Sequence, residues 1–216
     1  MTFSHGESID VRHVTTNQPF CAGTILIQQG QLIVTLHTDH IANQVTVYRV
    51  MGVYGSQEAG ETIWECAIRE AREKLQIQVQ LRPSPIMYFH DVDTGEIKPI
   101  SSTDTVPPFL LERQSNLYPY VPLRRGLPVG PYTYFGIFLT EPFQPIIQSD
   151  NIEGILSIPL NLCPTLLQQP TLETIIQQGA TLLERTPLPR QHQLRIHPGD
   201  TFTTALRLLQ KHPELL

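Results

Sequence analysis

The sequence predicts an α/β fold, because segments with strand periodicity and segments with helix periodicity follow one another along the chain. Residues 20–27 and 31–37 alternate as a strand pair, with a turn that ends at Gly30. Residues 45–53 are rich in Val, Thr and Tyr, which favours a further strand. Residues 63–76 then carry apolar side chains at helical spacing.

The remainder of the chain continues this mixture. Further strands are predicted at residues 77–81, 86–90, 132–139 and 152–158. A helix is predicted at residues 171–184, with Gly179 as its weak point, and a small helix at residues 201–211. At 216 residues, the chain fits one domain with additions and can bury a sizeable core.

The helix predicted at residues 63–76 is amphipathic and carries carboxylates. Its apolar face is formed by Trp64, Ala67, Ile68, Ala71 and Leu75, with Arg69, Arg72 and Glu73 away from it. Glu70 and Glu73 are three residues apart, so they are expected to project together from the edge of the apolar face. Two carboxylates and a backbone carbonyl make a partial site for Mg²⁺, which prefers oxygen ligands. Alternatively, these charges belong to a solvated helix face.

The spacing of residues before and within this helix is the most specific feature of the chain. A glycine, a glutamate, an arginine–glutamate pair, an apolar residue, a third glutamate and a final apolar residue stand at Gly55, Glu61, Arg69, Glu70, Ala71, Glu73 and Ile77. The segment resembles the Nudix box, the motif of enzymes that cleave nucleoside diphosphates linked to another group. Lys74 and Gln76 depart from the motif, which has a glutamate and a glycine at these positions.

The resemblance implies the domain organisation. It predicts a Nudix-like α/β/α sandwich around a mixed β-sheet in residues 18–185. A polar arm, residues 1–17, precedes this domain, and residues 186–216 form a linker and a C-terminal helix. Residues 95–131 are rich in proline and are predicted to be a loop-like insertion.

The resemblance also implies a role for each matching residue. Glu70 and Glu73 match carboxylates that serve catalysis and bind the metal ion, and the carbonyl oxygen at Gly55 is expected to join them. The residue matching Glu61 supports the loop in the family. Arg69 is expected to orient Glu61 or a neighbouring carboxylate.

Lys74 stands where the family has a principal metal ligand. Two unit charges 4 Å apart interact by about 4 kcal/mol at an effective dielectric constant near 20, so a lysine there repels a metal ion. We therefore expect Mg²⁺, or Mn²⁺, to bind with low affinity, and Glu153 to supply the missing carboxylate, with Asp150 and Glu112 as alternatives. Lys74 could instead turn to solvent, or contact a phosphate group directly. A non-glycine residue at Gln76, where the helix ends, costs about 1 kcal/mol.

The proline-rich segment has two interpretations. It is either a surface loop packed by its own aromatic residues, or a lid in which Arg124 or Arg125 binds a phosphate group of the substrate. The net charge of −5 argues against nucleic acid as a partner. No apolar run has membrane-spanning length and no leader is visible, so we expect a cytoplasmic protein without a membrane partner; a homodimer is compatible with the sequence.

Two functions follow from these observations. The first is a metal-assisted Nudix hydrolase whose substrate is a small nucleoside diphosphate derivative and whose metal site is compromised. The second is a non-catalytic Nudix-fold module that binds a ligand or regulates another protein. Cys21, Cys66 and Cys163 are widely spaced and indicate neither a disulfide framework nor a zinc site.

Overall fold

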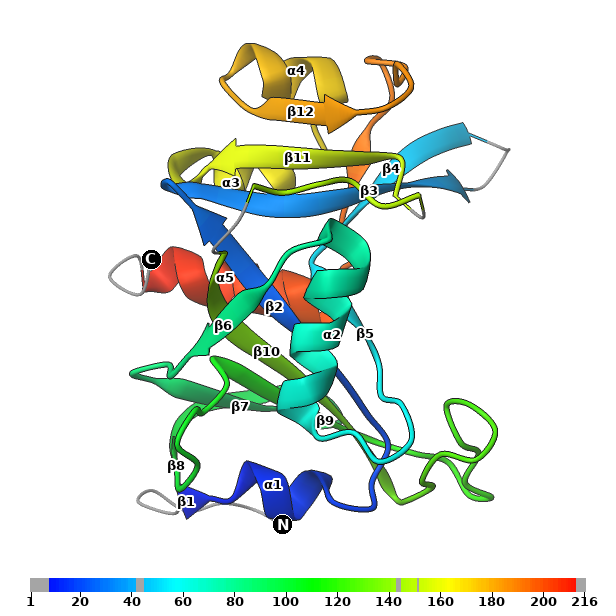
Figure 1. The fold of residues 1–216 in the computed structure, drawn as a ribbon, viewed down its shortest axis with the longest axis vertical. Helices are drawn as coiled ribbons and strands as arrows, with labels where there is room; N and C mark the ends of the chain where they lie inside the picture. The colour runs from blue at the N-terminus through cyan, green and yellow to red at the C-terminus, as the bar shows by residue number, and fades with distance from the viewer. Residues whose placement is uncertain (1–7, 42–44, 143–144, 151, 213–216) are drawn as a thin grey trace. The chain divides into compact units, whose positions relative to one another are not determined.

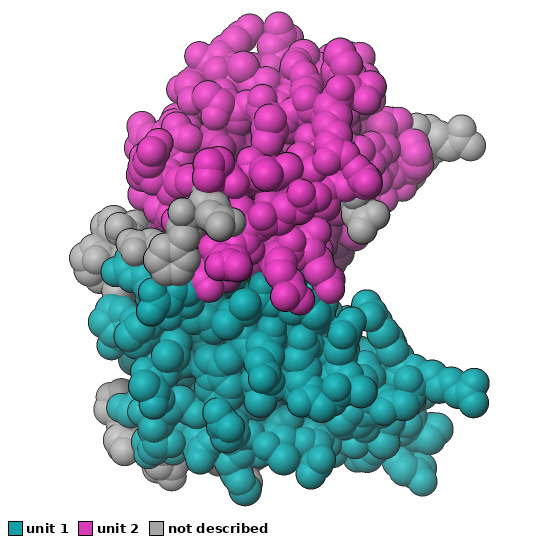
Figure 2. Space-filling view, in the orientation of Figure 1, with its two compact units in different colours: residues 1–24, 54–70, 80–140 teal, residues 25–53, 71–79, 141–216 magenta. Residues whose placement is uncertain are grey.

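The computed structural model describes residues 8–41, 45–142, 145–150 and 152–212 (Figure 1). Strands in mixed parallel and antiparallel pairing and several helices make up these residues, which confirms the predicted α/β fold class. The chain divides into two compact units, coloured separately in Figure 2. Unit 1 comprises Met1–Thr24, Tyr54–Glu70 and Gln80–Thr140, and unit 2 comprises Ile25–Val53, Ala71–Val79 and Glu141–Leu216.

Unit 1 is built on a mixed sheet. Its elements are β1 (Ser8–Ile9), α1 (Val11–Thr15), β7 (Met87–Asp91), β8 (Glu96–Ser102) and β9 (Leu110–Ser115), with most of β5 (Val53–Ser56), β6 (Val79–Arg82) and β10 (Tyr132–Pro142) and the first half of β2 (Phe20–Gln28). The order is β1-β8-β7-β9-β10-β2, while β5 pairs with β2 and β6 with β10. Strand β7 runs parallel to β9 and antiparallel to β8.

Unit 2 contains a second group of paired strands. Its elements are β3 (Gln31–Ile41), β4 (Val45–Met51), β11 (Gly154–Pro159), β12 (Thr181–Glu184), β13 (Leu194–Arg195), the short helices η2 (Leu160–Leu162), α3 (Cys163–Leu166) and α4 (Leu172–Gln177), and α5 (Thr201–Lys211). The order β2-β3-β11-β12 uses the second half of β2, and β4 pairs with β3 and β13. Asp200 caps the N-terminus of helix α5, and its side chain accepts a hydrogen bond from the backbone N–H of Phe202.

Helix α2 (Ile63–Leu75) confirms the helix predicted at residues 63–76 and contributes to the hydrophobic core of each unit. Ile63, Cys66 and Ala67 belong to the core of unit 1, together with residues such as Phe20, Leu111 and Phe138. Ala71 and Leu75 belong to the core of unit 2, together with residues such as Leu26, Ile33 and Ile155.

The predicted apolar face of α2 is wrong at Ile68. Its side chain is 40% exposed, because the buried face runs through Ile63, Cys66, Ala67 and Glu70 and leaves Ile68 at its flank. The end of the helix agrees with the sequence. Gln76 follows α2 with a φ of 53°, the left-handed conformation that glycine adopts in the family motif.

The predicted helix at residues 171–184 is too long. Helix α4 ends at Gln177, Gly179 takes a φ of 116°, and Thr181–Glu184 form strand β12 beside β11. Gly179 lies between the end of α4 and the start of β12, because a residue with a positive φ interrupts helical hydrogen bonding.

Three segments expected to be irregular contain regular structure. Residues 95–131 hold β8 and β9, so only residues 116–131 form a long loop. Residues 187–198 include β13, in which Leu194 is fully buried beside β4. The described part of the N-terminal arm contains β1 and α1, with Val11 buried.

Candidate functional site

Arg69 is the centre of a buried network in unit 1. Its Nε donates to Oε1 of Glu61 at 2.7 Å, its Nη1 to Oε1 of Glu70 at 2.8 Å, and its Nη2 to the carbonyl oxygen of Ser56 at 2.8 Å. The side chain is mostly buried, with 9% of the residue exposed. Burial acts to lower the pKa of Arg69, but the hydrogen bonds to Glu61 and Glu70 outweigh it and raise that pKa, so the guanidinium stays charged.

The glycine at position 55 makes room for the Glu70 carboxylate. A Cβ atom on Gly55 would overlap both oxygens of that group, so any side chain at position 55 has to displace the carboxylate. Glu70 is 5% exposed. The carboxylate is therefore fixed between a backbone without a side chain and the guanidinium of Arg69.

The loop before α2 is held by its own polar side chains. Oε2 of Glu61 accepts a hydrogen bond from the backbone N–H of Glu58 at 2.9 Å, so Glu61 joins the loop to Arg69. Gln57 is buried and exchanges hydrogen bonds with the backbone of Phe20 in β2. No sequence pattern marks Ser56 or Gln57, because Ser56 contributes a backbone carbonyl group and Gln57 a contact with a distant strand.

Cys66 is a structural residue of this network. It is fully buried in the core of unit 1, its Sγ lies 3.6 Å from the carbonyl oxygen of Gly55, and burial raises its pKa to about 12. A thiol with this pKa is protonated at neutral pH and is a poor nucleophile.

Two carboxylates of α2, those of Glu70 and Glu73, lie in different environments. Glu70 is buried, whereas Glu73 and Arg72 are exposed. The two side chains therefore differ in burial, and the expectation that they project together from one edge of the helix stays a prediction. Arg69 causes the difference, because its hydrogen bond and charge compensate the burial of Glu70 and draw that side chain into unit 1.

Lys74 and Glu153 have opposite effects on the pKa of a histidine of unit 2. Lys74 is half-buried, and the charges of both residues act on the ring of His37 in β3. Burial lowers the pKa of His37, Glu153 opposes this effect, and Lys74 and Arg49 add to it. Oε2 of Glu153 also accepts a hydrogen bond from the backbone N–H of Thr38 at 2.9 Å.

The other carboxylates proposed as metal ligands have partners. Glu112 is buried in unit 1, with Oε1 2.6 Å from Nδ1 of His90, and Asp150 forms an ion pair with Arg185 in unit 2. Within the described residues, no group of three or more His, Cys, Asp and Glu side chains could hold a metal ion. A Mg²⁺ or Mn²⁺ ion bound to the described residues would therefore rest on fewer than three of these side chains, together with carbonyl groups or water.

Arg124 and Arg125 lie in the loop of residues 116–131, and both are exposed. Among the described residues, neither forms an ion pair. Their charges are therefore accessible to an anion in solution, while the aromatic residues Tyr118 and Tyr120 of the same loop pack edge to face.

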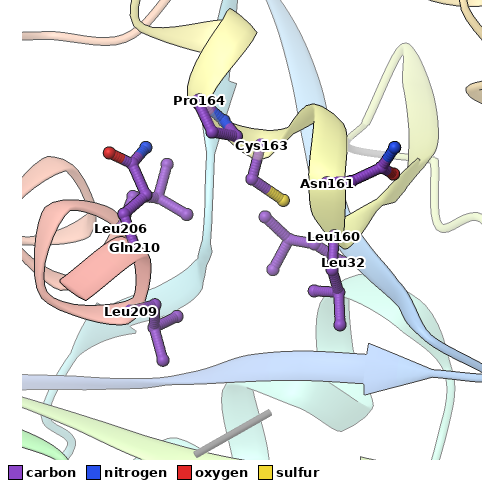
Figure 3. A pocket seen from close by; sticks show the side chains of 8 residues that line it. All are labelled: Leu32, Leu160, Asn161, Cys163, Pro164, Leu206, Leu209 and Gln210. Atoms are coloured by element: carbon purple, nitrogen blue, oxygen red, sulfur yellow. The ribbon is translucent and has the colours of Figure 1, made fainter. Parts of the chain in front are cut away.

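An apolar cavity of unit 2 has a different character. It has a volume of about 540 Å³ and lies between β3, η2, α3 and α5 (Figure 3). Leucines such as Leu32, Leu206 and Leu209 line it with Cys163, and the only polar side chains that line it are the amides of Asn161 and Gln210. It carries no charged group and does not suit a phosphate.

No protein-family model matches the chain, and a search of curated proteins found no match. Solved structures that are similar to it include a Nudix hydrolase from Nitrosomonas europaea, with 11% identity, coverage of 67% of this chain and 62% of that one, and a TM-score of 0.37. A Nudix-family hydrolase from Clostridium perfringens has 12% identity, coverage of 68% and 84%, and a TM-score of 0.39. The protein DR0079 of Deinococcus radiodurans has 15% identity, coverage of 89% and 83%, and a TM-score of 0.40.

The chain spans less than two thirds of the length of the first of these structures. All three have a TM-score below 0.5, a partial likeness that does not by itself assign a function. In the described residues, no helix is both long and apolar enough to cross a membrane.

Proposed function

We propose that the chain is a Nudix-type hydrolase of a nucleoside diphosphate linked to another group, with a compromised metal site and slow turnover. The network around Arg69 carries this proposal. Glu61, Arg69 and Glu70 stand at the spacing of the Nudix box, and in unit 1 they form one buried hydrogen-bonded group against Gly55. On a solvated helix face, the charged side chains would be exposed to water and would not form such a network.

Each residue has a role in the proposal. Arg69 and Glu61 position Glu70, and Glu73 is the exposed carboxylate that remains accessible to substrate. Arg124 and Arg125 supply positive charge for the phosphate groups. Glu73, together with the phosphates of the substrate, would hold Mg²⁺ or Mn²⁺, which would offset the negative charge of the phosphates. We place this activity in the cytoplasm.

A second candidate function is a ligand-binding module without hydrolysis. Lys74 favours it, since a lysine replaces the expected metal-binding glutamate and is half-buried near His37 rather than fully exposed. In this function the ammonium group of Lys74 takes the place of a metal ion and binds phosphate directly.

Calorimetry of Mg²⁺ binding and an assay of phosphate release over a nucleotide panel test the proposal. We expect weak Mg²⁺ binding and slow release for the wild type, and Lys74→Glu to tighten Mg²⁺ binding and raise the rate at least tenfold, or about 1.4 kcal/mol of barrier. Lys211→Glu makes the same charge change at an exposed position of α5 and should leave both unchanged. Glu73→Gln should abolish the remaining activity.

The outcomes separate the two functions. If the wild type turns over substrate fast and Lys74→Glu is no faster, Lys74 is a surface lysine without a role in hydrolysis. Absence of hydrolysis in wild type, Lys74→Glu and Glu73→Gln, with nucleotide binding retained in the wild type and lost in Lys74→Glu, would support the ligand-binding module.

A further inference from the structure

Residues 116–131 form a loop that projects from the strand pair β9–β10 of unit 1 (Figure 1). Leu117 is 91% exposed, Tyr118 is 85% exposed and Val121 is 75% exposed. Contiguous apolar surface of this kind marks a place of interaction. Of the twelve large apolar residues that are exposed in the described chain, six belong to this loop: Leu117, Tyr118, Tyr120, Val121, Leu123 and Val129.

The base of the loop is fixed by hydrogen bonds, whereas its tip is not. The backbone N–H of Asn116 donates to the carbonyl oxygen of Pro131 at 2.8 Å, and Nδ2 of Asn116 donates to that of Gly130 at 2.9 Å. Among the described residues, no hydrogen bond or ion pair joins residues 117–129 to another part of the chain. The apolar side chains therefore stand on a preformed support and face solvent.

The charge of the loop is opposite in sign to that of the whole chain. Residues 114–140 contain no Asp or Glu, and Arg124 and Arg125 are exposed within the loop, although the chain has a net charge of −5. Basic side chains next to exposed leucine and tyrosine side chains are typical of segments that bind anionic membrane surfaces. The loop is therefore complementary to a surface that is both apolar and negatively charged.

Two features favour a lipid surface over a protein partner. Leu117 and Tyr118 are neighbours in sequence and both are almost fully exposed, so the apolar side chains surround the tip and do not form a single face. A fluid layer can contact all of them, whereas a protein surface contacts one side. In addition, a backbone N–H without a partner is costly in lipid, and four residues of the loop have no N–H because they are prolines: Pro119, Pro122, Pro128 and Pro131.

We propose that residues 116–131 attach the protein to the surface of a membrane that contains anionic lipids. Leu117, Tyr118 and Val121 enter the outer part of the acyl layer, and Arg124 and Arg125 bind lipid phosphate groups. Such a contact needs no apolar run of spanning length, so it goes beyond the expectation that the protein has no membrane partner. Anionic lipids of the cytoplasmic leaflet suit the cytoplasmic placement proposed above. The inference does not rest on the proposed hydrolysis.

Co-sedimentation of the full chain with vesicles, in the absence of nucleotide, tests the proposal. The vesicles consist of phosphatidylcholine alone or with about a quarter of phosphatidylserine. We expect the wild type to bind the anionic vesicles more tightly than the neutral ones, and added salt to weaken this binding. Leu117→Ser/Val121→Ser and Arg124→Gln/Arg125→Gln should each weaken binding to the anionic vesicles at least tenfold. Inorganic phosphate at the concentration of the lipid phosphate should not displace the protein.

The matched control makes the same two apolar substitutions outside the loop. Val45 and Leu183 lie in unit 2 and are 50% and 46% exposed, so Val45→Ser/Leu183→Ser removes one exposed valine and one exposed leucine. This variant should bind the anionic vesicles as the wild type does. The melting temperature of each variant is measured as well, and we expect it to stay close to that of the wild type because the substituted side chains are exposed.

Insertion of the tip is measured with a fluorescent reporter. The natural chain has one tryptophan, Trp64, which packs against the core of unit 1, and Tyr118→Trp adds a second at the tip of the loop. Vesicles with brominated acyl chains should quench the emission of Tyr118→Trp and leave that of the wild type unchanged.

Several results would overturn the proposal. These are failure of the wild type to bind the anionic vesicles, equal binding by Leu117→Ser/Val121→Ser, displacement by inorganic phosphate, and unquenched emission of Tyr118→Trp. Dimerisation of the wild type that Leu117→Ser/Val121→Ser abolishes, without vesicle binding, would show that a second copy of the chain covers the loop instead.

Discussion

The two ends of helix α2 place the same kinds of side chain in opposite environments. At the end in unit 1, Glu70 and Arg69 are buried and bonded to each other. At the end in unit 2, Glu73 and Arg72 are exposed. One turn of helix separates the two glutamates in sequence, so helical spacing alone does not determine their environment.

The difference shows that the box-like segment has a structural part and a chemical part. The structural part consists of Gly55, Glu61, Arg69 and Glu70, which fit together in unit 1. The chemical part, around Glu73 and Lys74, carries the departure from the motif. Substitutions at the first part should change mainly stability, and substitutions at the second mainly ligand binding.

The largest effect is expected at Arg69. Arg69→Met leaves the buried carboxylate of Glu70 without its counter-charge and should destabilise the fold by roughly 3–5 kcal/mol. Arg72→Met, at an exposed position of the same helix, should change stability by less than about 0.5 kcal/mol. Urea unfolding of both variants measures the difference. Equal effects would mean that the buried network does not stabilise the protein.

The next largest effect on stability is expected at Glu70, compared with Glu73. Glu70→Gln weakens charged hydrogen bonds to Arg69 and should cost roughly 1.5–3 kcal/mol, whereas Glu73→Gln should stay within about 0.5 kcal/mol of wild type. The same unfolding experiment compares them. A loss of stability in Glu73→Gln as large as that in Glu70→Gln would contradict the different environments of the two side chains.

A smaller, stabilising effect is expected at Gln76. Its positive φ strains any residue with a Cβ atom, so Gln76→Gly should stabilise the fold by roughly 0.5–1 kcal/mol after the added flexibility of the unfolded chain is subtracted. Gln78→Gly is the control, because Gln78 does not take a positive φ and should gain nothing. Thermal unfolding of both variants decides whether residue 76 is strained.

The smallest effect concerns pH. Burial lowers the pKa of His37 from its ordinary value of 6.5, so the unfolded chain takes up a proton at a higher pH than the folded protein does. This contribution to stability is present above pH 6.5 and is lost as the pH falls through the lowered pKa. His37→Gln should show a weaker loss of stability between pH 8 and pH 5 in thermal unfolding. An identical pH profile would exclude His37 as the titrating group.

Local patterns predicted much of the fold. The strand pair on either side of Gly30, helix α2 and helix α5 follow from periodicity, and the left-handed residue at position 76 follows from the motif. Helix α4, which ends at Gln177, was predicted too long. Residues 181–184 are apolar enough to suit either a helix or a strand, and their pairing with β11 makes them a strand. Strand β13 likewise forms by pairing with β4, and no pattern in its own sequence predicts it.

The site was predictable only where contacts are close in sequence. The partners of Arg69 lie within the box-like segment, and the sequence analysis named two of them, Glu61 and Glu70. The contacts of Glu112 with His90 and of Asp150 with Arg185 join residues on different elements. No spacing rule connects such pairs, so their carboxylates could be mistaken for metal ligands.

The path of the chain between the two units has a consequence for fragments of the protein. The chain passes from one unit to the other after Thr24, Val53, Glu70, Val79 and Thr140, and these five points lie inside β2, β5, α2, β6 and β10. No single cut therefore releases either unit as a continuous polypeptide. We expect truncated versions of this protein to be insoluble or unfolded. A fragment suited to expression has to contain all five points at which the chain passes between the units.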